Sequence, residues 1–103
     1  MEKPQVITSP DGDIQLINYK IVTSMFGDMF AVGTVKNISL KSNLSAIVKA
    51  DYYDARGNYI DSETDTIRRL EPGKYAAFEV VYSGQIRYRI KNLKLSVNTI
   101  GKM

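Results

Sequence analysis

The sequence predicts an all-β fold, an antiparallel β-sandwich of about seven strands. Apolar and polar residues alternate with period two along most segments of the 103-residue chain, which is the pattern of half-buried strands. Turn-forming residues recur about every ten positions, and no segment carries the apolar stripe of an amphipathic helix. Because a one-sided strand needs a second sheet to cover its apolar face, a sandwich is favoured, with a small closed barrel as the rival.

The first long strand is predicted over residues 14–24. It follows a turn at PDGD (10–13), where Pro and Asp-Gly favour a chain reversal. Within it, Ile17, Tyr19 and Ile21 alternate with polar neighbours and are predicted to share one face.

A second strand is predicted over residues 29–39, which are rich in β-branched side chains. Residues 25–28 separate it from the first strand, and Gly27 is the expected bend. Gly33, inside the second strand, predicts a bulge or a close approach of two backbones.

The clearest alternation lies in residues 44–54. The residues predicted to face the core are Leu44, Ala46, Val48, Ala50 and Tyr52. The strand ends at Asp54-Ala55-Arg56-Gly57, which predicts a type I turn with Gly57 in the left-handed conformation and a bulged hairpin. Asp54 is expected to bind the turn backbone.

Residues 58–67 are polar on both faces, which predicts an exposed edge strand. Asp61, Glu63 and Asp65 share one face of this strand. Carboxylates can gather a calcium ion, but same-face residues lie about 6.6–6.8 Å apart along a strand. The favoured interpretation is therefore a charged edge that discourages pairing with other strands.

Two further segments complete the predicted sandwich. A turn at EPG (71–73) precedes residues 75–82, whose predicted core face consists of Ala76, Phe78, Val80 and Tyr82. In the last segment, Tyr88 and Ile90 have one phase, and the opposite phase is taken by Leu93, Leu95 and Val97. A bulge near Asn92 would explain this change of phase.

Composition excludes several functional classes. The length predicts a single domain over residues 1–103, with residues 1–13 as a loosely ordered N-terminal segment. The chain has no Cys and no His, which excludes disulfides, thiolate nucleophiles, Cys/His zinc sites and the usual general base. We therefore expect a protein that is not an enzyme and has no cofactor, metal or small-molecule substrate.

Cell location is open at this stage. The N-terminus lacks the apolar region of a secretory signal, and no apolar run approaches the ~18 residues of a membrane span. Either the protein is cytoplasmic or an export signal or anchor is missing from this chain.

Two sets of side chains are candidate binding residues. Tyr53, Tyr59 and Tyr75 lie in the phase opposite to the core; if they gather on neighbouring strands, they form an exposed aromatic patch for a protein partner. Arg87, Arg89 and Lys91 are predicted to share a strand face that could meet an anion, with Tyr88 between them.

The charge balance argues against strong binding of nucleic acid through these basic residues. The net charge is only +3, which argues against a dedicated nucleic-acid binder. A cationic strand face suits anionic lipid headgroups or an acidic partner equally well. A solvent-exposed face without any ligand is the competing interpretation.

Two Asn-x-Ser triplets, at Asn37 and Asn43, fit the glycosylation pattern. Asn37 is predicted instead to hydrogen-bond the backbone at a strand end, and the sequence does not decide whether either residue is glycosylated.

Three segments resemble the FxLYD domain of bacterial and archaeal proteins: VGTVKNIS (32–39), ADYYDARGNYI (50–60) and LEPGKYAAF (70–78). The matching positions are Gly33, Val35, Asn37, Ser39, Tyr53, Asp54, Gly57, Leu70, Pro72, Gly73 and Phe78. The chain departs from the motif at Ala50 and Tyr52, which implies a repacked core. The resemblance implies an immunoglobulin-like sandwich, an extracytoplasmic setting in envelope or secreted proteins, and no catalytic residue or cofactor.

These observations lead to two functional hypotheses. The first is a non-catalytic β-sandwich module for protein interaction or structural spacing, whose protein partner the sequence does not identify. The alternative is a weak anion-binding domain for nucleic acid or an anionic membrane surface, through the basic residues.

Overall fold

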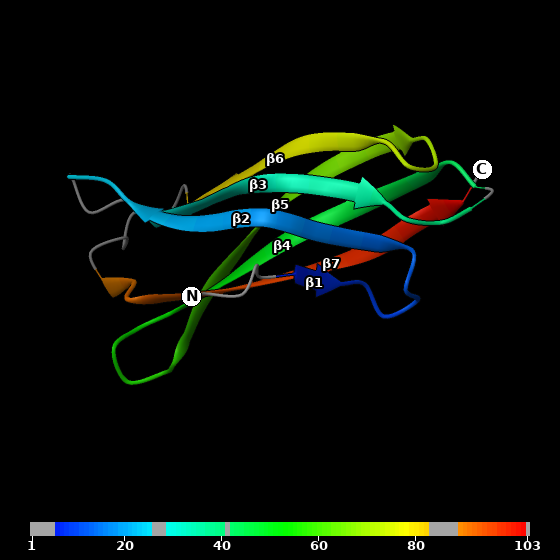
Figure 1. Ribbon diagram of the computed structural model, residues 1–103. Coiled ribbons are helices and arrows are strands. Elements are labelled where there is room, and N and C mark those ends of the chain that lie inside the picture. The colour runs from blue at the N-terminus through cyan, green and yellow to red at the C-terminus, as the bar shows by residue number, and fades with distance from the viewer. Residues whose placement is uncertain (1–5, 26–28, 41, 83–88, 103) are drawn as a thin grey trace.

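Two antiparallel β-sheets stack into a sandwich (Figure 1). The structure, a computed structural model, describes residues 6–25, 29–40, 42–82 and 89–102. Within these residues it has seven strands: β1 (Val6–Thr8), β2 (Ile14–Thr23), β3 (Met29–Asn37), β4 (Leu44–Tyr53), β5 (Tyr59–Leu70), β6 (Tyr75–Val81) and β7 (Asn92–Lys102). Sheet A has the order β1-β2-β3-β6 and sheet B the order β5-β4-β7. The predicted fold class is confirmed.

The strand neighbours are those of an immunoglobulin domain, but the chain order is rotated. In a constant-type domain the sheets run A-B-E-D and C-F-G. Here β2-β3-β6 correspond to D-E-B, and β5-β4-β7 correspond to G-F-C. The chain therefore passes through the positions of D, E, F and G before those of B and C, and β1 adds a strand beside β2.

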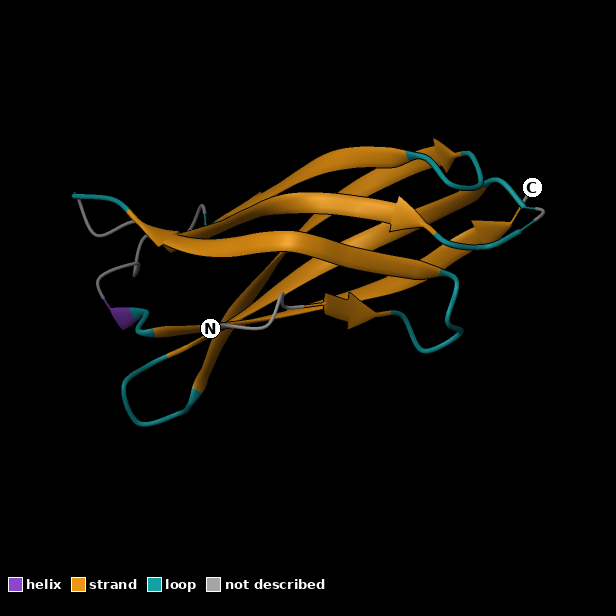
Figure 2. Ribbon diagram, viewed as in Figure 1, coloured by secondary structure: helices purple, strands orange, loops and turns teal. Residues whose placement is uncertain are grey.

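The core lies between the two sheets, and β4 contributes most to it. All five residues that its alternation assigns to the core are buried: Leu44, Ala46, Val48, Ala50 and Tyr52. On β6, Phe78 and Val80 are buried as predicted, and Tyr82 is buried just after the strand. Figure 2 shows that strands make up most of the described chain and that the loops lie at the two ends of the sandwich. No helix among the described residues is long and apolar enough to cross a membrane.

A bulge in β2 changes the predicted face of that strand. Ile17 pairs with Thr34 and Lys20 with Val32, so Asn18 and Tyr19 together lie opposite Gly33. Asn18 has a left-handed backbone with φ of 51°, which Asn tolerates better than most residues. Tyr19 packs against the core, whereas Ile17 lies in the opposite phase, beside Thr34. The prediction that Ile17 and Tyr19 share a face is therefore wrong.

Gly33 makes the close approach that its position predicted. A Cβ atom on Gly33 would lie 2.7 Å from the Tyr19 Cα atom and 2.8 Å from Cε2 of Phe78. These separations are shorter than van der Waals contact allows, so only glycine lets the bulge in β2 lie against β3 and the core.

Two expectations concern the ends of the chain. Of the N-terminal segment 1–13, residues 1–5 lie outside the described residues; in the remainder, β1 pairs with β2, and Ser9 bonds Ile14 and Gly12 through its backbone. The change of phase near Asn92 is not a bulge, because β7 only begins at Asn92. The irregularity in β7 lies near its end, where the pairing with β4 shifts between Thr99 and Gly101. Gly27 and Tyr88 lie outside the described residues.

The acidic face of β5 contacts the neighbouring edge of the other sheet. β5 is an edge strand, as predicted, and the Asp65 Oδ2 atom accepts a hydrogen bond of 3.0 Å from the Glu79 backbone N–H on edge strand β6. Asp65 thus satisfies an edge donor that another chain could otherwise pair with. The described residues contain no group of acidic side chains placed to hold a metal ion.

Tyr52 carries a buried hydroxyl group that has no hydrogen-bond partner among the residues that the structure describes. Its ring is fully buried and packs edge-to-face on Tyr82 with centroids 5.1 Å apart. Tyr52→Phe keeps this packing and removes a polar group whose desolvation is uncompensated. We expect the variant to be more stable by about 1 kcal/mol in urea unfolding. A loss of stability would show that the hydroxyl has a partner.

The same substitution is expected to change the alkaline limit of stability. Burial, reinforced by the Glu63 carboxylate, raises the pKa of Tyr52 to about 12, above the unfolded value of about 10. The neutral phenol therefore favours the folded state below pH ~10, and this contribution is lost as the pH rises towards 12. Tyr52→Phe should show a smaller alkaline loss of stability than the wild type.

Candidate binding surface at the β4–β5 hairpin

The β4–β5 hairpin extends beyond the body of the sandwich (Figure 1). Its turn has the predicted form: the Gly57 N–H donates to the Asp54 carbonyl at 3.1 Å, and Gly57 has a left-handed φ of 85°. Asp54 N–H donates to the Asn58 carbonyl at 2.9 Å, which closes the bulged loop. The turn is therefore confirmed as a type I turn completed by a left-handed glycine.

The Asp54 side chain holds this turn in place. Its Oδ1 atom accepts hydrogen bonds of 2.9 Å from the backbone N–H groups of Asn58 and Arg56, and Arg89 Nη2 lies 3.7 Å from Oδ2. The backbone hydrogen bond from Asn58, with the further hydrogen bonds of the turn and the Arg89 charge, lowers the pKa of the Asp54 carboxyl. The charged carboxylate is thus the form that fixes the hairpin, and Arg89 links it to the segment before β7.

Tyr53 and Tyr59 form an aromatic pair at the base of the hairpin. They are cross-strand neighbours, and their rings meet edge-to-face with centroids 6.1 Å apart. Tyr53 is half-buried, whereas Tyr59 is 59% exposed. The two tyrosines therefore share the outer face of sheet B.

A hydrogen-bonded row fixes the exposed Tyr59 ring. The Tyr59 hydroxyl lies 2.7 Å from Ser62 Oγ, and Ser62 Oγ donates to Asp51 Oδ1. Asp51 in turn lies 3.6 Å from Lys49 Nζ. The Tyr59 side chain is thus held by the hydrogen bond at its hydroxyl and by the contact of its ring with Tyr53. Because the ring is already fixed, less side-chain entropy is lost when a ligand stacks on it.

A hollow with a cationic rim lies beside the tyrosines. It has a volume of about 270 Å³ and is lined by Tyr53, Gly57, Asn92, Leu93 and Lys94. The Lys94 Nζ atom lies 5.5 Å from the centre of the Tyr53 ring, in a cation–π contact. Lys91 is exposed and adjoins the hollow, because its backbone N–H donates to the Tyr53 carbonyl at 2.9 Å. We call Tyr53, Tyr59, Lys91, Lys94 and this hollow the hairpin surface.

The structure divides the residues that the sequence proposed for binding. Tyr53 and Tyr59 come together, but Tyr75 begins β6 at the opposite end of the sandwich, so the three tyrosines do not form one patch. The basic residues do not share a strand face either, because Arg89 and Lys91 precede β7. Arg87 lies outside the described residues. Instead, Arg89 and Lys91 lie beside Tyr53, so the two separate candidate sets meet at one hairpin.

The sequence analysis does not single out two residues that shape this surface. Lys94 pairs with Asp51 across the β4–β7 ladder and its amine lies over the Tyr53 ring. Ser62 is a polar position on an edge strand, and it holds the Tyr59 hydroxyl. The signal for both would have been the cross-strand register, which requires knowing that β7 is the neighbour of β4.

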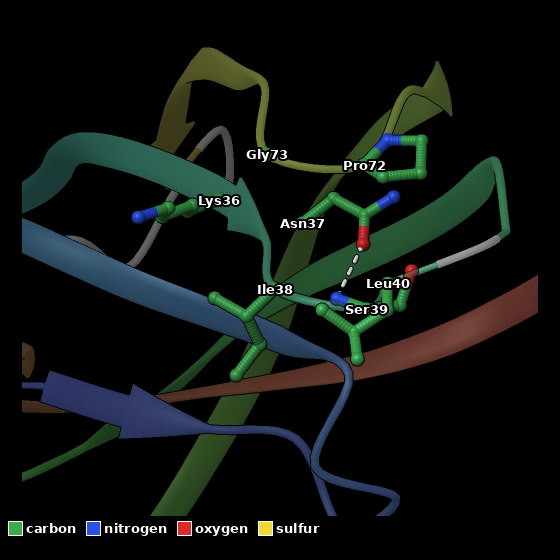
Figure 3. A pocket seen from close by; sticks show the side chains of 7 residues that line it. All are labelled: Lys36, Asn37, Ile38, Ser39, Leu40, Pro72 and Gly73. Atoms are coloured by element: carbon green, nitrogen blue, oxygen red, sulfur yellow. Dashed lines mark hydrogen bonds between the residues drawn. The ribbon is translucent and has the colours of Figure 1, made fainter.

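A second hollow, of about 340 Å³, lies at the opposite end (Figure 3). Its centre is Asn37, which is fully buried. The Asn37 Nδ2 group donates to the carbonyls of Leu70 at 2.7 Å and Ser42 at 2.8 Å, and Oδ1 accepts from Ser39 N–H at 2.9 Å. Asn37 thus ties the β3–β4 loop to the end of β5, as predicted for backbone bonding, and its side-chain amide has no room for a glycan.

Four of the residues behind the FxLYD resemblance, Asn37, Ser39, Pro72 and Gly73, meet at this corner. Gly73 N–H donates to the Asn37 carbonyl at 2.8 Å, and Pro72 and Ser39 line the same hollow. Figure 3 shows Asn37 between the loops that carry Pro72 and Ser39. These motif positions therefore serve the joining of the two sheets, and the hairpin surface lies at the other end.

Comparison with known proteins gives the fold and no activity. No protein-family model matches the chain. The uncharacterised protein MJ0360 of Methanocaldococcus jannaschii is 28% identical over 68 residues, which cover 66% of this chain and 50% of that protein. The chain thus spans about half the length of this relative. The crystal structure of cj0090 from Campylobacter jejuni has a TM-score of 0.57 at 14% identity, over 81% of this chain and 83% of that one, so the likeness shows a shared fold.

Proposed function

We propose that this chain is a non-catalytic, FxLYD-like β-sandwich module that binds a segment of a partner protein at the hairpin surface. The observation that carries the proposal is the fixed pair of Tyr53 and Tyr59 beside a hollow with a lysine amine over one ring. Tyrosines with few rotatable bonds and a polar tip are the side chains most enriched at protein-binding surfaces. The FxLYD resemblance supports placing such a module in an envelope or secreted protein.

The charges around the hairpin surface favour an acidic peptide as the ligand. Lys91 and Lys94 are exposed, and no ion pair to either is present among the described residues. By contrast, the nearby carboxylates are already engaged: Asp54 with the turn and Arg89, Asp51 with Ser62 and Lys49. The two lysines therefore remain for a carboxylate of the ligand, while the tyrosine rings offer stacking area.

The anion-binding alternative has less support. Of its three residues, Arg89 is engaged with Asp54 and Arg87 lies outside the described residues, which leaves Lys91. Nucleic acid or an anionic membrane would be recognised mainly by charge, with binding that falls steeply as salt rises. The tyrosine rings would also suit stacking of nucleic-acid bases, so what disfavours this alternative is the loss of two of its three basic residues.

Selection of peptides from a displayed random library tests the proposal. Peptides that are selected on the wild-type chain are expected to be rich in Asp and Glu and to bind Tyr59→Ala at least about tenfold more weakly. Tyr75→Ala is the matched control, because Tyr75 is 58% exposed against 59% for Tyr59 and also has a lysine over its ring. Its affinity should stay within about twofold of the wild type.

Two results would overturn the proposal. One is a selection that yields no peptide whose binding depends on Tyr59. The other is binding of single-stranded DNA or of anionic vesicles that depends on Lys91 and falls steeply with salt, without any peptide binding; that result would establish the anion-binding alternative.

A further inference from the structure

The outer face of sheet A carries apolar side chains that nothing in the described structure covers. Ala31 and Val35 on β3 are buried, so the alternate positions Phe30, Val32 and Thr34 point away from the core. Six of the outward apolar residues, none of them packed against the core, are Val6, Ile17, Val22, Phe30, Val32 and Val81. We call these six residues the sheet A outer face.

These residues stand in register across the strands. Val22 pairs with Phe30, and Phe30 with Val81, which makes one wholly apolar row. The next row has Val32 in the centre, between Lys20 on β2 and Glu79 on β6. Val81 is exposed, and Val22, Phe30 and Val32 are half-buried. Apolar side chains that adjoin one another on an outer face in this way are a candidate interaction surface.

The outer face of sheet B shows what an exposed face of this chain otherwise looks like. Its central cross-strand row consists of Thr64, Lys49 and Ser96, all of them polar. Ile47 and the Tyr53–Tyr59 pair on this face each share their cross-strand row with a polar residue, so a wholly apolar row is not a general property of the strands.

Lys20 and Glu79 flank Val32 with opposite charges. Neighbouring strands are about 4.8 Å apart, so these two positions, separated by β3, lie about 10 Å from each other. Both side chains are exposed, and neither forms an ion pair with any described residue. They form no ion pair with each other in this structure, so both charges are available to another molecule.

We propose that the sheet A outer face binds a second copy of this chain around a two-fold axis that runs along β3. Such an axis exchanges the β2 and β6 flanks of the sheet, so that Lys20 faces the partner subunit's Glu79 and Glu79 faces the partner subunit's Lys20. Phe30 and Val32 then pack on the same residues of the partner. This self-complementary surface is the requirement for a symmetric dimer interface.

The charges select this axis. A two-fold axis that runs across the strands would place Lys20 against the partner subunit's Lys20, and like charges in an interface are costly. The proposed contact ends before Lys36. This residue lies on β3 near the end of the strand, and its Nζ atom lies 5.1 Å from the centre of the Tyr75 ring. Stacked sheets cross at about 30°, so strand ends such as this diverge from the partner.

This inference is independent of the proposed function. The hairpin surface lies on the outer face of sheet B, so the dimer leaves it exposed and presents two copies of it on opposite sides. A partner with two acidic segments would then bind with increased avidity.

Charge reversal tests the dimer and its axis together. By sedimentation equilibrium of the full chain over a concentration series, the wild type is expected to dimerise. Lys20→Glu and Glu79→Lys should each raise the dimer dissociation constant at least about tenfold, because each places like charges together twice. The double variant Lys20→Glu/Glu79→Lys restores both pairs and should return to within about threefold of the wild type.

The controls separate this interface from general charge effects. Lys49→Glu makes the same charge change on the outer face of sheet B and should leave the dissociation constant unchanged. A wild type that remains monomeric up to about 1 mM would overturn the proposal, as would single variants that dimerise like the wild type. A dimer that the double variant does not restore would refute this axis. Circular dichroism of each variant verifies that it is folded.

Discussion

Replacing Asn37 with alanine is expected to lower the free energy of unfolding by about 3 kcal/mol or more. The substitution removes three hydrogen bonds in a fully buried position. The Ser39 N–H group and the Leu70 carbonyl would both lose the Asn37 partner, and each buried polar group left unpaired costs about 1–3 kcal/mol. Urea unfolding, followed by circular dichroism or by tyrosine fluorescence, measures the change.

The chain supplies a matched control for this loss. Asn43 lies in the same loop and also begins an Asn-x-Ser triplet, but it is exposed. Asn43→Ala should change the unfolding free energy by less than about 0.5 kcal/mol. Asn37→Asp keeps the acceptor for Ser39 N–H but loses the donor to the two carbonyls, so it should be at least as damaging as Asn37→Ala. If Asn37→Ala unfolds like the Asn43 variant, the two sheets are not joined by this side chain.

Period-two alternation identified the central strands because both of their neighbours were strands of the same sheet. β4 lies between β5 and β7, so its side chains alternate strictly between the core and the outer face, and every predicted core residue is buried. The hairpin turn was predictable for a different reason: Asp54 and Gly57 are the residue types that this loop chemistry requires. Local sequence thus determined both features.

Bulges and strand limits were harder to predict because they depend on the neighbouring strand. The shift at Asn18 exists because Tyr19 must pack beside Gly33 of β3, and only the weak preference of Asn for a left-handed backbone marks it in the sequence. Likewise, Ile90 and Leu93 have different phases because β7 starts between them, which the residues alone do not distinguish from a bulge.

The candidate surface was half-predictable. Tyr53 and Tyr59 flank a recognisable turn, so their contact follows once the hairpin is accepted. Tyr75 shares their phase but not their end of the molecule, and only the topology separates it: the chain runs the full length of β5 before Tyr75 begins β6. The apolar outer face of sheet A could not be predicted for the same reason, because it consists of rows across strands that are distant in sequence.

The two ends of the sandwich have different roles in this arrangement. At one end, Asn37 and Gly73 join the loops of both sheets through buried hydrogen bonds, which fixes the frame. At the other end, the hairpin carries exposed tyrosines whose loss should leave the frame intact. A substitution at Tyr59 is therefore expected to affect binding, whereas one at Asn37 affects folding, and the two readouts can be measured separately.

Gly33→Ala is expected to destabilise the fold by about 3 kcal/mol, although it adds a single methyl group. The new Cβ atom would lie 2.7 Å from the Tyr19 Cα atom, which belongs to the backbone, and 2.8 Å from the buried ring of Phe78. Neither group can move without a large energetic cost. Moving Tyr19 requires the bulge at Asn18 to be removed, and moving Phe78 disturbs the core between the sheets. Urea unfolding measures the loss.

Ala77→Val is the control for Gly33→Ala, because it adds more volume at an exposed position of the neighbouring strand β6. Its stability should stay within about 0.5 kcal/mol of the wild type. Because the bulge, the left-handed Asn18 and Gly33 form one packing unit, a Gly33→Ala protein as stable as the Ala77 variant would mean that β2 does not lie against β3 in this way. The same result would remove the reason why Tyr19 faces the core although Ile17, two residues earlier, faces outward.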